Sequence, residues 1–111
     1  MNVEMKIVSN INVLSISGNF TFNTLGDIRN TLKKDIASAS SAKFLVDLTQ
    51  VGLIDSTALG TIISIYKTVL SRKGTFGVIV QNGDVKDVFF TVGLNKLFPI
   101  FDDEAQGIKS V

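Results

Sequence analysis

The middle of the chain alternates between compact apolar runs and a stretch with helical spacing, and this alternation limits the possible folds. The runs Lys43–Leu48 and Thr75–Val80 are short and apolar at their centres, as is typical of strands buried on both faces. Between them, apolar residues recur every three or four positions from Thr57 to about Arg72, which predicts an amphipathic helix. A strand–helix–strand run of this kind indicates an α/β fold.

The N-terminal segment predicts two strands that pair antiparallel. Apolar and polar residues alternate from Asn2 to Val8, which is the period of a half-buried strand. The run Asn10–Gly18 follows across the short Ser9–Asn10 link and is expected to be the second arm of a hairpin. The apolar positions on one side of the first strand are Val3, Met5 and Ile7.

A first helix is expected from Thr24 to Ser38, because apolar residues recur there at three- and four-residue intervals. Thr24 and Asp27, three residues apart, resemble a capping box at its start. Small residues then end the helix before the strand at Lys43. The residues of the apolar stripe are Leu25, Ile28, Leu32 and Ile36.

The C-terminal third predicts smaller elements. Gly74 suits the C′ position of the helix that ends near Arg72. Residues 81–84 predict a turn, and a short helix that ends near Gly93 is expected after it. Residues 97–101 predict a short edge strand, where the single proline is tolerated, and residues 102–108 a final helical turn or two. We therefore expect one α/β domain over residues 1–111, with a mixed sheet of four or five strands and about four helices.

Composition excludes several classes of function. Cysteine and histidine are both absent, which removes thiolate nucleophiles, the zinc sites built on those ligands and the commonest general base. Eleven basic residues are scattered among ten acidic ones, so no basic face for nucleic acid is expected. No apolar run approaches the roughly 18 residues that span a bilayer, and no signal peptide is recognisable. We expect a soluble, cytoplasmic protein without a metal or cofactor of its own.

The stretch Ile54–Gly60, with the sequence IDSTALG, joins the central strand to the helix that follows it. Asp and Ser at a helix start accept hydrogen bonds from free backbone N–H groups, so Asp55 and Ser56 are both candidates for the N-cap. Ser56 has no histidine to activate it, and neither Ser-x-x-Lys nor Gly-x-Ser-x-Gly surrounds it. No glycine-rich phosphate-binding loop is present either. We therefore assign no catalytic residue.

The helix after Ser56 has an unusual second face. Its expected core arc is formed by Leu59, Ile62, Ile63, Tyr66, Val69 and Leu70. The opposite arc carries small side chains, namely Thr57, Gly60, Thr61, Ser64, Thr68 and Ser71. This helix carries Lys67 and no acid, and a flat surface of small residues suits the docking of another protein. Ala58 and Ile65 widen the apolar arc, and either a neighbouring helix or a partner explains them.

The motif Asp55–Gly60, the strand before it, the spacer Thr49–Leu53 and the helix after it resemble the STAS domain of bacterial anti-sigma factor antagonists. The resemblance covers essentially the whole chain in element order and length, and it includes Gly18 at the end of the second strand. It implies a protein that binds an anti-sigma factor with serine kinase activity and so frees a sigma factor for transcription. Phosphorylation of the antagonist breaks that complex, and a phosphatase restores it.

Matched position by position, the resemblance makes Ser56 the phosphorylated residue, Asp55 a supporting acid and Thr57 part of the docking edge. ATP, magnesium and the catalytic base would belong to the kinase, so the chain is expected to be a substrate and regulator and not an enzyme. The family often has an acid-rich loop after the second strand, where this chain has Asn19 and Thr21. The expected partner-binding residues are Asp55, Thr57, Ala58, Gly60, Thr61, Ser64, Asn19 and Thr21.

The sequence leaves open the role of two aromatic residues and two other functions for the chain. Phe20 and Phe22, in the loop after the second strand, are either core anchors or apolar contacts for a partner. A STAS scaffold or partner-switching module of another signalling pathway would not be phosphorylated at Ser56. A small ligand-binding α/β domain or enzyme would use Asp55, Ser56 and a distant lysine around a pocket at the strand ends.

Overall fold

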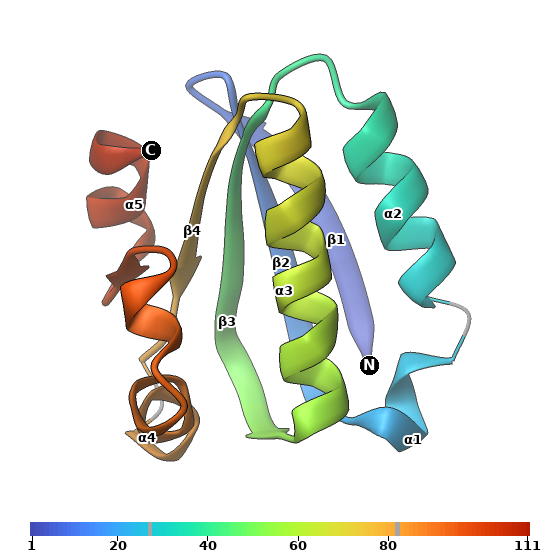
Figure 1. Ribbon diagram of the computed structural model, residues 1–111, viewed down its shortest axis with the longest axis vertical. Helices are drawn as coiled ribbons and strands as arrows, with labels where there is room; N and C mark the ends of the chain where they lie inside the picture. Colours follow the sequence, from blue (N-terminus) through green and yellow to red (C-terminus); the bar gives the residue numbers. More distant parts are fainter. Residues whose placement is uncertain (27, 82) are drawn as a thin grey trace.

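A mixed sheet of five strands forms the centre of the molecule, in the spatial order β1-β2-β3-β4-β5 (Figure 1). The computed structural model describes residues 1–26, 28–81 and 83–111, and only the backbone at Ile28 and Thr31. The first pair of strands is antiparallel and the other neighbouring pairs are parallel, which confirms the predicted mixed α/β fold. The strands are β1 (Asn2–Val8), β2 (Ile11–Phe20), β3 (Lys43–Ile54), β4 (Thr75–Ile79) and β5 (Ile100–Phe101).

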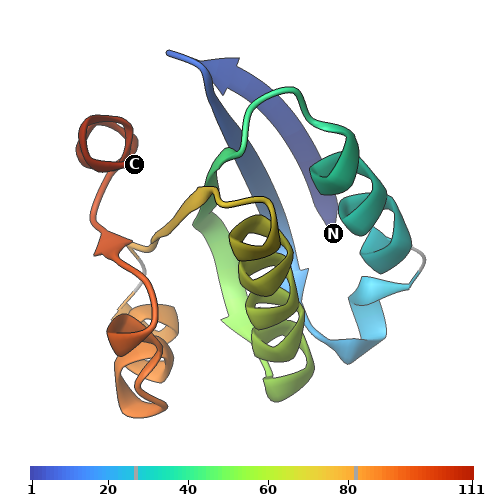
Figure 2. The same ribbon diagram turned by 45° about the horizontal axis from the view of Figure 1, so that its top comes forward.

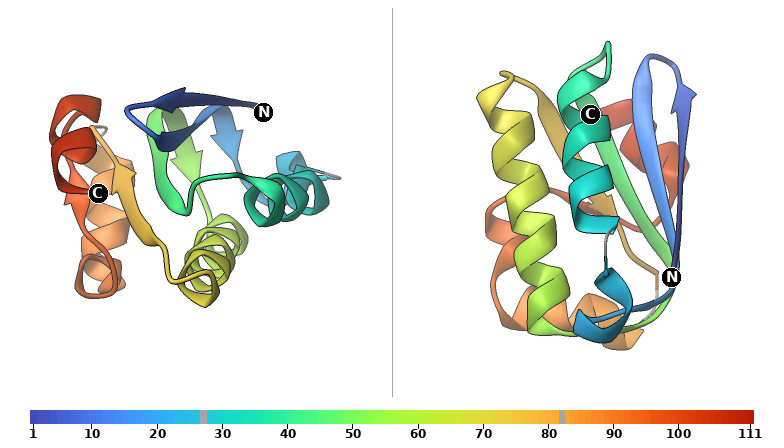
Figure 3. Two further views of the ribbon diagram at one scale, coloured as in Figure 1. Left: turned by 90° about the horizontal axis from the view of Figure 1, so that it is seen from above. Right: turned by 90° about the vertical axis from the view of Figure 1, so that its right-hand side faces the viewer.

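Helices cover both faces of this sheet. The described chain forms α1 (Phe22–Leu25), α2 (Ile28–Ser38), α3 (Ser56–Ser71), α4 (Gly83–Thr91), α5 (Glu104–Ser110) and the 3-10 turn η1 (Leu94–Lys96). Figure 2 and the left view of Figure 3 show α2 and α3 side by side on one face. The larger core lies beneath them and extends to α4. On the other face, Ile108 of α5 packs on a smaller cluster around Val13 and Leu45.

The predicted N-terminal hairpin is confirmed, and Ser9 and Asn10 both have positive φ angles (51° and 66°), as in a tight two-residue turn. The prediction that β1 is half-buried is only partly correct. Val3 packs against the core, whereas Met5 and Ile7 are 41% and 62% exposed. β1 is an edge strand, and the helices leave this part of it uncovered.

The prediction of one helix from Thr24 to Ser38 is wrong, because the chain forms two helices there. Gly26 interrupts them with a φ of 42° and a ψ of −134°, a conformation outside the helical region that glycine adopts easily. Thr24 does take part in a cap, but its hydroxyl accepts a hydrogen bond from the Thr21 N–H (3.0 Å) at the start of α1. Asp27, its predicted partner, lies outside the described residues.

The helix α3 matches its prediction closely, but its C-terminal end differs in detail. Lys73, with a φ of 57°, occupies the left-handed C′ position that was predicted for Gly74. Gly74 follows it, and a Cβ atom there would lie 2.0 Å from the carbonyl oxygen of Ala42. This position therefore needs glycine for space and not for its φ angle.

The remaining boundaries shift by a few residues. β3 continues six residues beyond its predicted end at Leu48, through the segment that was predicted as a spacer. The predicted edge strand from Leu97 shortens to β5, since η1 and the proline precede it, but it does lie at the edge of the sheet. Asn82, in the predicted turn before α4, lies outside the described residues.

Candidate functional site

Two segments far apart in sequence meet at one end of the sheet. β2 and β3 are parallel neighbours, and Phe20 at the end of β2 pairs with Ile54 at the end of β3. The end of β2 and the start of α1 therefore lie beside the start of α3 (Figure 1). The prediction of a loop at Asn19 is wrong, because β2 continues to Phe20, and Thr21 is already the N-cap of α1. The carboxyl ends of parallel strands are a common place for binding sites, because the chain leaves each strand there in a loop.

The Asp55 carboxylate holds these two segments together. One oxygen, Oδ1, accepts a hydrogen bond from the Ala58 N–H at 3.0 Å, which makes Asp55 and not Ser56 the N-cap of α3. The other oxygen, Oδ2, accepts a hydrogen bond from the Phe22 N–H at 2.9 Å, at the start of α1. Both bonds favour the charged carboxylate, and they hold the pKa of Asp55 below its ordinary value.

Ser56 is the first residue of α3, and its side chain is exposed. None of the described residues forms a hydrogen bond with its hydroxyl, so the oxygen is available to a partner. The positive end of the helix dipole at this position favours an added negative group. Asp55 fixes the backbone beside it through the cap.

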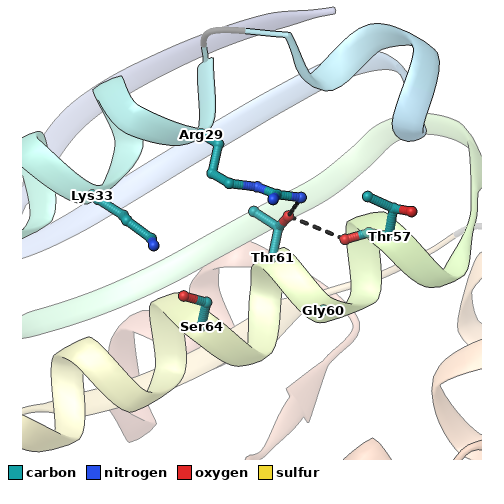
Figure 4. A pocket seen from close by; sticks show the side chains of 6 residues that line it. All are labelled: Arg29, Lys33, Thr57, Gly60, Thr61 and Ser64. Carbon is teal, nitrogen blue, oxygen red and sulfur yellow. Dashed lines mark hydrogen bonds between the residues drawn. The ribbon is translucent and has the colours of Figure 1, made fainter.

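The small-residue face of α3 does not form the flat surface that was predicted. α2 lies along it, and the two helices leave a groove between them, with a cavity of about 320 Å³ (Figure 4). We call this the α2–α3 groove; its lining residues are Arg29, Lys33, Thr57, Gly60, Thr61 and Ser64. Thr61 is only 4% exposed, and its hydroxyl donates to the Thr57 carbonyl and accepts from Arg29 Nη2. Of the predicted contact residues on this helix, Gly60 is exposed, and Thr57 and Ser64 are half-buried.

The residues that widened the apolar arc of α3 belong to the core. Ala58 is fully buried and Ile65 nearly so, which supports the explanation by internal packing. The prediction that Ala58 offers a contact surface is therefore wrong, since its side chain is unavailable to a partner. Leu70, predicted for the core arc, is instead half-exposed at the far end of the helix.

The two aromatic residues near the end of β2 have different roles. Phe20 is fully buried in the core, as one explanation predicted, whereas Phe22 is 72% exposed. The chain turns at Thr21 to begin α1, so Phe22 no longer follows the alternation of the strand. Sequence reasoning also missed Arg29 and Lys33, although two cations four residues apart on a predicted helix indicate a shared face.

Comparison with known proteins identifies the family. The family model of the STAS domain matches residues 2–107. The chain belongs to the STAS domain family. The anti-sigma F factor antagonist of Paenibacillus polymyxa is 24% identical to it over 108 residues, which cover 97% of this chain and 92% of that protein.

Solved structures share the fold of this STAS domain. An anti-sigma factor antagonist from Mycobacterium paratuberculosis superposes with a TM-score of 0.89 at 21% identity, covering 99% of this chain and 92% of the other. The Bacillus cell fate determinant SpoIIAA, in its phosphorylated form, superposes with a TM-score of 0.73 at 15% identity, covering 97% of each chain. At these identities the likeness establishes a common fold.

Within residues 1–26, 28–81 and 83–111, no three acidic side chains come close enough together to hold a metal ion. None of the helices in these described ranges has the length and apolar character needed to cross a membrane.

Proposed function

We propose that this STAS domain is an anti-sigma factor antagonist that is switched by phosphorylation of Ser56. In this proposal it binds an anti-sigma factor with serine kinase activity and so releases a sigma factor for transcription in the cytoplasm. The observation that carries the proposal is the position of Ser56, which is exposed, has an unengaged hydroxyl and opens α3 beside the Asp55 cap. The relative named as an anti-sigma F factor antagonist supports it.

Electrostatics explains how phosphorylation would switch binding without unfolding the domain. A phosphoserine carries about −1.5 to −2 charges at pH 7. The positive end of the helix dipole tolerates that charge at the start of α3. A partner that packs over Ser56 would, however, have to desolvate the phosphate next to the Asp55 carboxylate, which costs more than covering a hydroxyl. Phosphorylation should therefore weaken binding and leave the fold intact.

The chain supplies the surface, and its partners supply the chemistry. ATP, magnesium and the catalytic base belong to the kinase, and a phosphatase removes the phosphate. Asp55 positions the backbone at Ser56, while Asn19, Thr21, Thr57, Gly60 and Ser64 are the proposed contacts around it. Thr61 acts from the floor of the groove, where it fixes Arg29.

The test uses the serine-kinase anti-sigma factors encoded in the same genome. Each is titrated by calorimetry with the wild-type chain, Ser56→Asp, Ser56→Ala and the control Ser71→Asp, which adds the same charge at the other end of α3. We expect one kinase to bind the wild type, Ser56→Ala and Ser71→Asp, whereas Ser56→Asp binds at least about 10-fold more weakly. With MgATP, mass spectrometry should find phosphate on Ser56 of the wild type and none on Ser56→Ala.

One observation favours a second candidate function. Asn19 at the end of β2 and Thr21 at the start of α1 are uncharged, where the family resemblance implies acids, so the partner at this end need not be the usual kinase. In that case the domain is a STAS scaffold in another signalling pathway, and Ser56 is never phosphorylated. Failure of every anti-sigma kinase to bind the wild type or to phosphorylate Ser56 would favour this candidate.

A further inference from the structure

Among the residues that the structure describes, the α2–α3 groove carries positive charge without a matching acid. Arg29 and Lys33 project from α2 toward α3, where Thr57, Thr61 and Ser64 line the facing wall (Figure 4). Both cations are exposed, and no described acid pairs with either of them or lines the groove. The interaction that orients Arg29 is a 3.3 Å hydrogen bond to the neutral Thr61 hydroxyl. The groove is therefore complementary to negative charge.

An apolar position adjoins these cations. A second cavity, of about 290 Å³, shares Arg29 and Thr57 with the α2–α3 groove and extends to α1. Phe22 lines it with most of its ring in solvent. Aromatic residues, phenylalanine among them, and arginine are both enriched in protein–protein interfaces. Cationic and apolar contacts thus follow each other along one path that passes Thr57, the neighbour of Ser56.

Gly60 leaves the wall of the groove open. A glycine in the middle of a helix lowers its stability relative to alanine, so such a residue usually has a reason. Apart from its chain neighbours and the adjacent backbone of α3, none of the described residues has an atom within 4 Å of where a Cβ of Gly60 would be, and the φ angle of Gly60 is not positive. Internal packing does not require this glycine, but the close approach of another chain would.

We propose that the α2–α3 groove binds an acidic segment of the anti-sigma factor, with its carboxylates at Arg29 and Lys33 and an apolar side chain against Phe22. This inference rests on the proposed function and deepens it by naming the chemistry of the partner. The groove continues from the cations to an exposed aromatic ring, and a free anion would leave that ring uncovered. Charge complementarity and the neighbouring apolar anchor together fit a protein segment.

The same arrangement gives the switch an electrostatic basis. Ser56 directly precedes Thr57, which lines both cavities. A phosphate on Ser56 would place negative charge at the end of the path that the acidic segment occupies, and like charges at an interface strongly disfavour binding. Phosphorylation would then repel the segment as well as add a desolvation cost.

The experiment reverses the charge of the groove. The anti-sigma factor that binds the wild type is titrated with the double variant Arg29→Glu/Lys33→Glu and with the control Lys34→Glu/Lys67→Glu. The control makes the same change in net charge at exposed residues outside both cavities, Lys34 on α2 and Lys67 on α3. We expect a loss of affinity of about 100-fold for the groove variant and at most about 3-fold for the control. The wild-type affinity should also fall more steeply with salt than that of the groove variant.

Circular dichroism and thermal unfolding first establish that both variants fold. Exchanging acids for lysines in the partner should restore binding to Arg29→Glu/Lys33→Glu, which identifies the acidic segment.

If the groove variant binds as tightly as the wild type while Ser56→Asp still loses binding, the groove proposal is overturned and the proposed function is not. A wild-type chain that binds none of the anti-sigma factors would overturn both proposals. Inorganic phosphate is titrated as a competitor of the partner. If phosphate displaces the partner, and the acid-to-lysine exchanges in the partner do not change the partner's affinity, the groove binds a free anion and the proposal of an acidic segment is overturned.

Discussion

At the scale of single residues, Asp55 has the largest structural role at the site. Its two carboxylate oxygens accept hydrogen bonds from the first turns of two different helices, Ala58 in α3 and Phe22 in α1. One side chain thus fixes both segments that border Ser56. These bonds lower the pKa of Asp55 relative to the unfolded chain, so its ionisation is linked to folding.

We predict that Asp55→Asn weakens the acid sensitivity of folding. Because the pKa of Asp55 is lower in the folded state, its stabilising contribution is present above its unfolded pKa of about 3.9. It is lost as the pH falls through the lower folded pKa. Asparagine cannot ionise and has one carbonyl oxygen in place of two carboxylate oxygens. Thermal unfolding between about pH 7 and pH 2.5 should show a lower Tm at neutral pH and a shallower decline below about pH 4.

The contradicting outcome is a decline in Tm below about pH 4 that is as steep in Asp55→Asn as in the wild type. That result would mean that the carboxylate does not hold α1 and α3 together through its charged form.

At the scale of secondary-structure elements, α2 and α3 are tied together at the end opposite the site. Arg72, the C-cap residue of α3, donates hydrogen bonds to the carbonyl oxygens of Ile36 (2.7 Å) and Ala39 (2.6 Å). These carbonyls lie at and just beyond the last turn of α2, where helical partners run out. The guanidinium therefore sets the spacing of the two helices that form the α2–α3 groove.

Arg72→Ala should destabilise the domain by about 1.5–3 kcal/mol, because it removes two charge-assisted hydrogen bonds from carbonyls near a helix end. Arg72→Lys should recover part of that loss, since an ammonium group reaches one carbonyl more easily than two. Urea unfolding measures the free energy, and amide hydrogen exchange should show the earliest opening in the last turn of α2. An unchanged exchange pattern in α2 would contradict this role.

The elements also show what the sequence could and could not predict. The α/β class, the hairpin, α3 and the position of Ser56 follow from apolar spacing, because burial imposes periods of two and 3.6 residues. The break at Gly26 was missed, since Leu25 and Leu32 keep a helical spacing across it. Arg29 facing Thr61 was equally unpredictable, because only the packing of α2 on α3 brings these residues together.

At the scale of the whole molecule, the sheet and its two cores lie apart from the surface that is proposed to bind the anti-sigma factor. The core side chains hold α3 from beneath, while Ser56 and the cations of the groove face outward. The contacts that fold the chain are thus separate from those that would bind a partner. Modification at Ser56 is therefore expected to change binding without unfolding the domain.

The most direct test compares the unphosphorylated chain with the chain fully phosphorylated on Ser56, each titrated by calorimetry against the same anti-sigma kinase without ATP. We predict that phosphorylation weakens binding at least about 10-fold, that it leaves the circular dichroism spectrum unchanged, and that phosphatase treatment restores the affinity. Equal affinities of the two forms, with both folded, would contradict the account.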